Sequence, residues 1–384
     1  MIKIEQPTGG DLGRGAGTTF VAGESVHFWA VNKNKRSVVL DLKTEQGKAL
    51  FYDLVRRSDI VFDNFRPGVL ERLKIDHDTL AQINPRIICT SVSAFGQDGP
   101  YRDQPGYDLS IQAMSGVMSL MGEPEGNPVR CGVPIGDLIG GMGGAMGTLA
   151  ALVERDRTGK GQRIDVALLD TQISLLMYWA TIFFATGEIA GRVGSGHPTI
   201  VPYGLFRTSD SYLVIAVFGD RFFQILCNTL GLDDLAADER LKTNPGRVRH
   251  RAEVVDRVQG VFSTKSTAEW LEILRVAGVP SAAVNDISQA LADPQVRHRG
   301  MVLEVEHPTA GTIGLLGNPI KTQEPRREIL PPPLFGEHTR EILGGLLGLS
   351  ETELDALDAA GVTRPASVRV SEEDVSGGSL EPVG

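Results

Sequence analysis

Few residues of this sequence belong to the types that build metal sites or disulfide frameworks. It contains three cysteines and seven histidines in 384 residues. Cys89, Cys131 and Cys227 lie far apart and form no C-x-x-C pair, which argues against a zinc ribbon or a disulfide framework and fits a reducing cytosol. We therefore expect a cytoplasmic protein without a metal site. The G-x-S-x-G, H-E-x-x-H and G-x-x-x-x-G-K-S/T motifs are also absent, which disfavours hydrolase, zinc-enzyme and nucleotide-kinase activities.

Positive charge and long apolar runs are scarce as well. The chain has 38 Lys and Arg against 48 Asp and Glu, a net charge of -10 at pH 7. This balance disfavours general nucleic-acid binding but allows a local basic pocket for a small anion. No signal peptide is recognisable, and the strongest apolar segment, residues 173–185, is shorter than the roughly 20 residues of a membrane helix. We expect no membrane span, and a buried helix over 173–185 at a subunit or domain contact.

The composition that remains is typical of a globular protein, with 41% apolar and 22% charged residues. In the first half, β-rich runs alternate with helical ones, which is the pattern of an α/β protein whose parallel sheet is covered by helices. The pattern predicts strands over 36–42, 59–65, 85–96 and 163–169, and helices over 44–58 with Thr44 as cap, 66–73, 106–122, after Asp137, and from Asp170 onward.

After a loop-rich stretch the pattern changes to that of a small α+β unit, with a strand over 211–218 followed by helices. We predict a large α/β domain over 1–186, a linker over 187–204, a small α+β domain over 205–306, a return to the large domain over 307–363 and a disordered tail over 364–384.

One acid stands alone in the segment GVPIGDLIGGMGGAMGTLAALV, residues 132–153. A carboxylate in apolar company is unfavourable unless it is paired or hydrogen-bonded. Gly132, Gly136, Gly140 and Gly144 recur every four residues, which puts the helical ones on one face. By pattern alone we favour close helix packing with Asp137 as the N-cap. The alternative is a reactive carboxylate that a bulky ligand must reach.

The segment extended to GVPIGDLIGGMGGAMGTLAALVERDRTGKGQRIDVALLD resembles the core signature of the class III CoA-transferases, the CaiB/BaiF or formyl-CoA transferase family. Further blocks resemble the family in its own order: NKNKRSVVLDLKTEQGKALFYDLVRRSDIVFDNFRPGVLERL, NPRIICTSVSAFGQDGPYRDQPGYDLSIQAMSG, GHPTIVPYGLF, ADPQVRHRGMV and LFGEHTREIL. The resemblance implies a Rossmann-like doubly wound large domain, a small domain and an interlocked, ring-like homodimer.

The resemblance also implies an enzyme of class EC 2.8.3.- in which Asp137 is the nucleophile. Its carboxylate attacks an acyl-CoA to form a mixed anhydride, an aspartyl-CoA thioester follows, and a carboxylic acid then takes the CoA. We expect amides at the helix start to keep Asp137 ionised against desolvation. Gly140 and Gly141 are expected to leave room for the thioester and to offer amides to oxyanions. No permanently bound cofactor is implied, since coenzyme A and acyl-CoA are substrates.

By the same resemblance, Lys43, Asn64, Phe65 and Arg72 fall on positions that hold CoA. Either basic residue alone is more often an ordinary solvated charge, but the set lies within matched motifs. Tyr107 is expected to hydrogen-bond the acyl or CoA group, with a packed aromatic as the plain alternative. The roles of His197 and Tyr203 stay open. A short dicarboxylic acid such as succinate is our guess for the acid.

Two other functions remain open, a 2-methylacyl-CoA racemase of the same fold and a non-enzymatic acyl-CoA-binding homologue. The racemase pattern has a histidine base before the aspartate of the segment that aligns with GYDLSIQA, where this chain has Tyr107 before Asp108. A phenol is a poor base at neutral pH, so the transferase is favoured. The family usually has a strand, a loop and a helix before the strand that residues 1–6 match, and we expect that unit to be missing.

Overall fold

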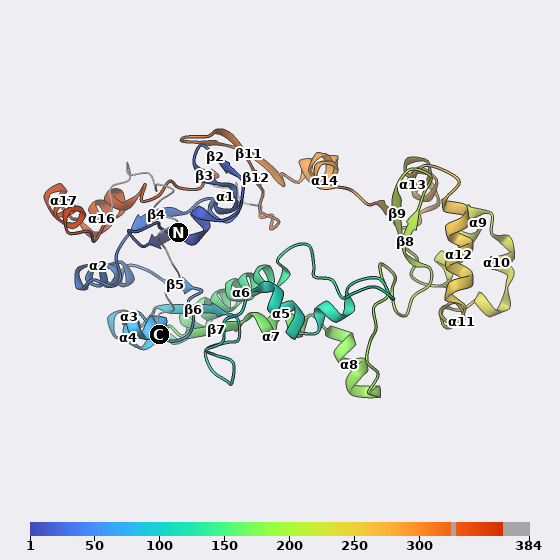
Figure 1. Cartoon of the computed structure of the whole chain (residues 1–384), viewed down its shortest axis with the longest axis horizontal. Helices are drawn as coiled ribbons and strands as arrows, with labels where there is room; N and C mark the ends of the chain where they lie inside the picture. The colour runs from blue at the N-terminus through green and yellow to red at the C-terminus, as the bar shows by residue number, and fades with distance from the viewer. Residues whose placement is uncertain (324–327, 364–384) are drawn as a thin grey trace. The chain divides into compact units, whose positions relative to one another are not determined.

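A computed structural model of the chain describes residues 1–323 and 328–363 (Figure 1). Contacts divide it into two units. Unit 1 comprises Met1–Ser93, Gly144–Asp165 and Ala290–Gly384, and unit 2 comprises Ala94–Gly143 and Val166–Gln289. Each is described by itself below. The tail predicted over 364–384 lies outside the described residues.

Unit 1 contains the parallel strands that the sequence predicts. Strands β5 (Ile60–Asp63), β6 (Ile88–Ser93) and β7 (Arg163–Ala167) form one sheet in that order, and β5 pairs with β6 in parallel. Strand β6 is buried at every position, as a central parallel strand should be. Strands β1 (Ile2–Glu5) and β4 (Arg36–Val39) form a separate parallel pair. Within the described residues the predicted doubly wound sheet is therefore two parallel pieces and not one continuous sheet.

Helices pack against these strands. Helix α2 (Glu45–Arg56) begins where predicted, with the Thr44 hydroxyl accepting a hydrogen bond from the backbone N–H of Gly47 at 3.0 Å. The other elements of unit 1 are β2 (Phe20–Val21), β3 (Glu24–Ser25), α1 (Val26–Asn32), α3 (Val69–Leu73), α4 (His77–Ile83), α15 (Pro294–His298), β11 (Val302–His307), β12 (Gly311–Leu316), α16 (Thr339–Leu347) and α17 (Glu351–Ala359).

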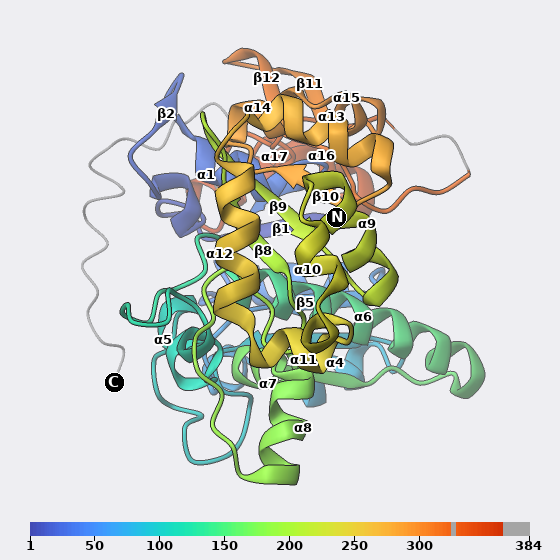
Figure 2. The same cartoon turned by 90° about the vertical axis from the view of Figure 1, so that its right-hand side faces the viewer.

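Helix α6 (Ile135–Thr158) is one long helix that crosses the division between the units (Figure 2). In unit 1 it lies close to the β5–β6–β7 sheet, because a Cβ added at Gly144 would approach the Phe62 ring to 2.8 Å and one at Gly147 would approach Ile164 to 2.8 Å. The Thr148 and Thr90 hydroxyls are hydrogen-bonded at 2.7 Å. By length and composition alone α6 could cross a membrane, although its glycines pack it against a sheet here.

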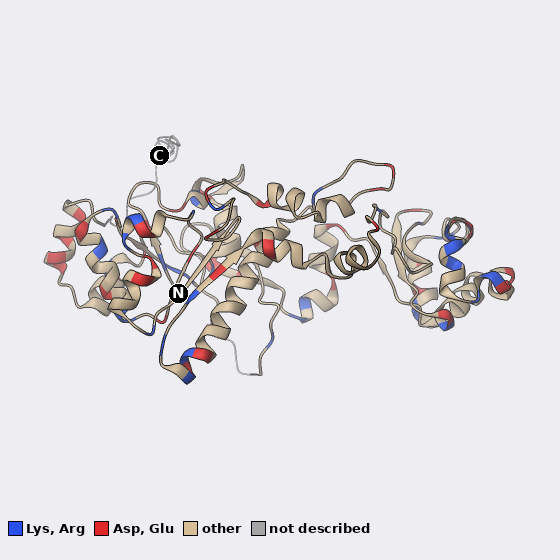
Figure 3. Cartoon of the chain, turned by 90° about the horizontal axis from the view of Figure 1, so that it is seen from below, with Lys and Arg blue, Asp and Glu red and all other residues tan. Residues whose placement is uncertain are grey.

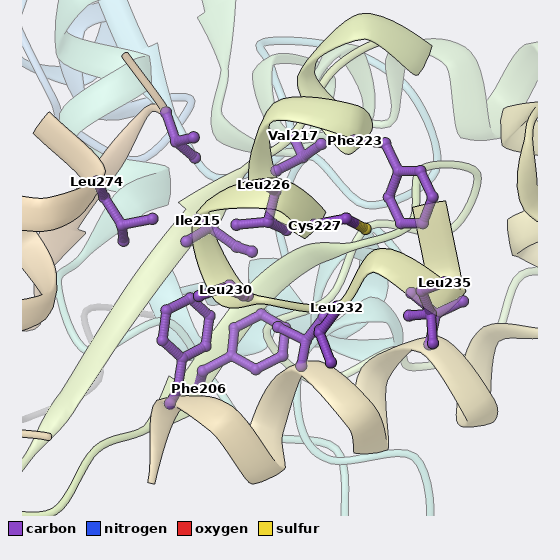
Figure 4. Packing of buried hydrophobic residues seen from close by; sticks show 14 of the residues in the cluster. Phe206, Ile215, Val217, Phe223, Leu226, Cys227, Leu230, Leu232, Leu235 and Leu274 are labelled. Carbon is purple, nitrogen blue, oxygen red and sulfur yellow. The ribbon is translucent and has the colours of Figure 1, made fainter. Parts of the chain in front are cut away.

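Unit 2 contains a self-contained α+β core. Antiparallel strands β8 (Tyr203–Arg207), β9 (Tyr212–Ala216) and β10 (Ser281–Ala283) pack with helices α9 (Asp220–Leu230), α12 (Arg251–Phe262) and α13 (Thr267–Ala277). Figure 4 shows Phe206, Ile215, Phe223 and Leu226 meeting in this core. Strand β9 and helix α9 lie where the sequence predicts them. Unit 2 also holds α5 (Asp108–Met114), α10 (Asp233–Ala237) and α11 (Asn244–Arg249), and α14 (Ile287–Ala292) lies at the second division.

The two units differ from the predicted domains in two places. Residues 94–143 and 166–186, predicted within the large domain, belong to unit 2, and the return to unit 1 begins at Ala290 and not at residue 307. Residues 94–143 and 166–186 fall in the same unit because helix α5 of the first segment contacts helix α7 (Leu168–Ser174) of the second.

The helix predicted from Asp170 onward is two helices. Helix α7 ends at Ser174, and α8 (Met177–Thr186) continues after a bend of 71° (Figure 1). The expectation that residues 173–185 are buried is wrong for the single chain, since α8 has no buried residue and Phe184 is 83% exposed. Its apolar side chains point to all sides, so no single face could cover them. The predicted subunit contact at this helix stays a prediction.

Candidate active site

The first turn of α6 holds Asp137 as its third residue. The helix begins at Ile135, three residues before the predicted start, so Asp137 is not its N-cap. Instead, the Asp108 side chain caps this helix, because its Oδ1 accepts a hydrogen bond from the backbone N–H of Gly136 at 2.8 Å. The Asp137 carboxylate is exposed, and no hydrogen bond to it is found among the described residues. Its capping role is therefore excluded.

The surroundings of Asp137 are apolar along the helix. Between Asp137 and Glu154 helix α6 has no charged residue (Figure 3). Gly141 lies one turn after Asp137 on the same face, and a Cβ there would meet nothing within 4 Å. An open face without a side chain thus lies beside the carboxylate.

The two glycines predicted at the site differ from each other. Gly141 is exposed, whereas Gly140 is buried, which assigns Gly140 to helix packing. The expectation that their amides bind oxyanions is wrong for a geometric reason. They are the sixth and seventh residues of the helix, and only its first four N–H groups lack a partner within the helix.

Helices α5 and α7 lie near α6 (Figure 1), and in unit 2 a polar network joins them around the start of α6. Asp108 Oδ2 accepts a hydrogen bond from Gln112 Nε2 at 2.7 Å, and Gln112 Oε1 accepts one from the backbone N–H of Cys131 at 2.8 Å. Ser115 Oγ donates to Gln172 Oε1 at 3.2 Å. Gln112 and Gln172 are both fully buried.

The pKa of the Asp137 carboxyl is shifted in the direction opposite to our expectation. Although Asp137 is exposed, partial desolvation of its carboxyl raises its pKa above the ordinary value of aspartate, and the negative charge of Asp108 raises it further. The helix-start amides therefore do not dominate. Gly136 donates its N–H to Asp108, and Leu138 donates its own to the carbonyl of Pro134. The resulting carboxylate is more basic, and hence a better nucleophile when ionised, than an ordinary aspartate.

Tyr107 and the histidine loop lie in the same unit. Tyr107 precedes α5 and is 77% exposed, so the alternative of a packed aromatic is wrong. The His197 ring lies edge-on to Tyr203, with 5.3 Å between ring centroids, and 6.3 Å from Tyr178, and its Nδ1 accepts a hydrogen bond from the N–H of Thr199. Burial and the charge of Arg251 lower the pKa of His197. A neutral imidazole packed against aromatic rings suits a structural role for this loop.

The residues expected to hold CoA lie in unit 1. Lys43 directly precedes the cap of α2, Asn64 and Phe65 follow β5, and Arg72 lies in α3. All four are exposed, and neither basic side chain forms an ion pair with any other described residue. They belong to a different unit from Asp137.

The loop after β5 has a defined shape. Asp63 Oδ1 accepts a hydrogen bond from the N–H of Phe65 at 3.1 Å, and Asp63 Oδ2 accepts one from the Ser91 hydroxyl at 2.7 Å. Burial raises the pKa of Asp63, and these two hydrogen bonds partly offset the effect. The loop that presents Asn64 and Phe65 is thereby tied to the carboxyl end of β6.

Other reactive groups are less suited to chemistry. Burial raises the pKa of the Cys89 and Cys227 thiols to about 12, which makes them inert. Within residues 1–323 and 328–363, no group of three or more His, Cys, Asp or Glu could hold a metal ion. The sequence did not predict Asp108, Gln112 and Gln172 as parts of the site. An acid in the first turn of a helix beside the glycine segment was the available signal for Asp108 only.

Comparison with known proteins gives this geometry its context. The family model described as CoA-transferase family III matches residues 1–339. A succinate–glutarate CoA-transferase of Agrobacterium fabrum is 39% identical over 364 residues, covering 92% of this chain and 90% of that protein. A human succinyl-CoA:glutarate CoA-transferase is 35% identical over 363 residues, covering 94% of this chain and 83% of that protein.

An acetyl-CoA:oxalate CoA-transferase of Acetobacter aceti is 38% identical over 321 residues, covering 83% of this chain and 81% of that protein. Among solved structures, a CaiB/BaiF family protein from Brucella suis has a TM-score of 0.79 and 36% identity, and the match covers 90% of this chain and 91% of that one. The likeness therefore extends over both units.

Proposed function

This chain belongs to CoA-transferase family III, and from that premise we propose that it moves CoA from an acyl-CoA to a free carboxylic acid with Asp137 as the covalent nucleophile. CoA transfer between acids is the activity named for its relatives. One observation carries the assignment of Asp137: its carboxylate accepts no hydrogen bond among the described residues, since Asp108 and not Asp137 caps α6.

The proposed reaction has two symmetric halves. The Asp137 carboxylate attacks the thioester carbonyl, the C–S bond breaks, and CoA leaves as a thiolate from a mixed anhydride. The thiolate attacks the aspartyl carbonyl of that anhydride and releases the donor acid, which leaves an aspartyl-CoA thioester. The acceptor carboxylate attacks this thioester to form a second anhydride. The thiolate then attacks its acyl carbonyl, so that the new acyl-CoA leaves and the Asp137 carboxylate is restored.

The proposed substrates are short dicarboxylic acids and their CoA esters. The names of the relatives include succinate, glutarate and oxalate, all of which are dicarboxylates. In the proposed complex, Lys43 and Arg72 meet the phosphates of CoA, and Asn64, Phe65 and Tyr107 contact its pantetheine arm or the acyl group. The exposure of these side chains and the absence of ion pairs at the two basic ones, among the described residues, support this use.

A cytoplasmic, interlocked homodimer is the proposed assembly. Its support is α8, where Met177 is 68%, Phe183 49% and Phe184 83% exposed in the single chain. A soluble monomer rarely leaves such a concentration of aromatic and aliphatic side chains in water, and a second copy would cover it.

Covalent loading tests the nucleophile. With succinyl-CoA and no acceptor, intact-protein mass spectrometry should show an adduct, and hydroxylamine should label Asp137. Asp137→Asn should leave the protein folded and abolish both the adduct and the transfer to glutarate. Asp170→Asn is the matched control, because Asp170 is also an exposed acid in the first turn of a helix, α7. Full transfer by Asp137→Asn would refute the proposal, and solvent deuterium at the α-carbon of a 2-methylacyl-CoA would point to the racemase.

A further inference from the structure

Asp108 contacts two elements that meet at the start of α6. One carboxylate oxygen accepts from the Gly136 N–H at 2.8 Å, and the other accepts from Gln112 Nε2 at 2.7 Å. Both partners are donors, so the site needs an acceptor at both positions. A carboxylate supplies two, whereas an amide of the same size supplies one acceptor and one donor.

Gln112 extends this contact by a second hydrogen bond. Its Oε1 accepts from the backbone N–H of Cys131, while its NH2 group is directed to Asp108. The orientation of the Gln112 amide is thus fixed from both ends, and the side chain is fully buried. Helix α5 consequently holds the segment 131–136 at both of its ends, and Asp137 is the next residue.

Helix α7 provides a third set of contacts to the start of α6. A Cβ at Gly136 would lie 2.4 Å from Gln172 Nε2 and 2.9 Å from Asp108 Oδ1, so the backbone of Gly136 is in direct contact with both side chains. Gln172 is itself fully buried, and its Oε1 accepts from the Ser115 hydroxyl. The first turn of α6 therefore cannot shift without breaking these contacts.

We propose that Asp108 is a positioning residue for Asp137: through Gly136 and Gln112 it fixes the first turn of α6 so that the neighbouring carboxylate faces the thioester. This inference rests on the proposed nucleophilic role of Asp137. A displacement of about 1 Å in a reacting group can lower a rate about 100-fold, so a clamp of this kind has a measurable effect.

The charge of Asp108 adds a second effect. Asp108 is the charged group that acts on Asp137, while the neighbouring side chain from α7, Gln172, is neutral. Its negative charge raises the pKa of Asp137, so removal of that charge should lower the pKa. The acid limb of the pH–rate profile should then move to lower pH. Position and charge can therefore be separated by two variants.

The two variants are Asp108→Asn and Gln112→Met, and both are measured with succinyl-CoA and glutarate. Asp108→Asn should lower kcat roughly 10- to 100-fold, with KM for succinyl-CoA within about threefold, and should move the acid limb to lower pH. Gln112→Met preserves volume and charge, so it should lower kcat and leave the acid limb in place. Adduct formation on Asp137 should slow to the same extent as kcat.

Asp76→Ala is the control for the general loss of a helix cap, since Asp76 caps α4 by accepting from the N–H of Thr79 at 3.1 Å. It should leave kcat unchanged. Thermal unfolding and circular dichroism establish that each variant is folded. Wild-type kcat and an unmoved acid limb in folded Asp108→Asn would overturn the inference while Asp137→Asn is inactive. An active Asp137→Asn would instead refute the proposed function itself.

Discussion

The carboxylates of Glu5 and Asp137 are held in opposite ways. Glu5 is 3% exposed, and both of its oxygens accept hydrogen bonds, one from Arg14 Nε at 2.7 Å and from the Asp11 N–H, the other from Arg14 Nη2 and from Ser37. Asp137 is exposed and accepts none among the described residues. Asp108, the charged group that raises its pKa, has the same sign.

The difference separates a structural acid from a reactive one. Arg14 is also buried and lies 3.9 Å from the centroid of the Phe28 ring, so the pair is embedded in aromatic surroundings. A carboxylate with four donors has no lone pair left for an electrophile. A carboxylate that is unpaired and next to a like charge contributes nothing to the fold but keeps its nucleophilicity.

The largest effect on stability is expected at the paired acid. Glu5→Gln removes the bidentate partner of the buried Arg14 and leaves it only the longer ion pair of Nη1 with Glu24 at 3.5 Å, which should lower the free energy of unfolding by about 3 kcal/mol. Urea denaturation followed by circular dichroism measures this loss. Glu45→Gln removes the exposed acid of the Glu45–Lys48 pair and should have a far smaller effect. Equal losses in the two variants would contradict the assignment of Glu5 as a structural acid.

The next effect concerns two glycines on either side of α6. Gly136→Ala places a Cβ 2.4 Å from Gln172 Nε2 and should cost about 1–3 kcal/mol by overpacking, with loss of activity. Gly141→Ala meets nothing within 4 Å, so it should stabilise the helix by about 0.5–1 kcal/mol and yet lower kcat, because its methyl group lies beside Asp137. Thermal melts and initial rates measure both signs. A stabilised Gly136→Ala would show that the clamp is loose.

Local signals in the sequence predict much of unit 1. The Thr44 cap, the helix after it and strand β6 are encoded by residues next to one another. The helix begins where predicted, and β6 lies inside its predicted range of 85–96. The start of α6 was predicted after Asp137 because the residue that caps it, Asp108, lies 28 positions earlier. A contact over that distance leaves no local pattern.

Helix α8 shows a second limit of prediction from the local sequence. A run such as 173–185 is apolar on all sides, so its periodicity cannot tell a buried helix from one that awaits a partner. The family motifs did identify Asp137 as a candidate nucleophile. The Gln112–Asp108–Gln172 network next to Asp137 could not be predicted, because glutamine is most often a surface residue. Only the fold brings these side chains of α5 and α7 together.

The smallest expected effect is the change in stability of Asp137→Asn. Its sign distinguishes a reactive Asp137 from an N-capping Asp137. The raised pKa means that the folded protein binds the proton of Asp137 more tightly than the unfolded chain does. This contribution to stability is present at low pH and is lost as the pH rises through the folded-state pKa. At pH 7 the ionised acid is therefore slightly unfavourable, and Asp137→Asn should raise the melting temperature a little. The rise is small because the side chain is exposed and solvent screens it. Below about pH 4, where aspartates are ordinarily neutral, the two proteins should melt together.

An N-capping Asp137 predicts a loss of about 0.5–2 kcal/mol even if Asn retains part of the cap. Scanning calorimetry of both proteins from pH 3 to pH 8 measures the sign, and a destabilised variant at pH 7 would return Asp137 to the class of structural acids to which Glu5 belongs.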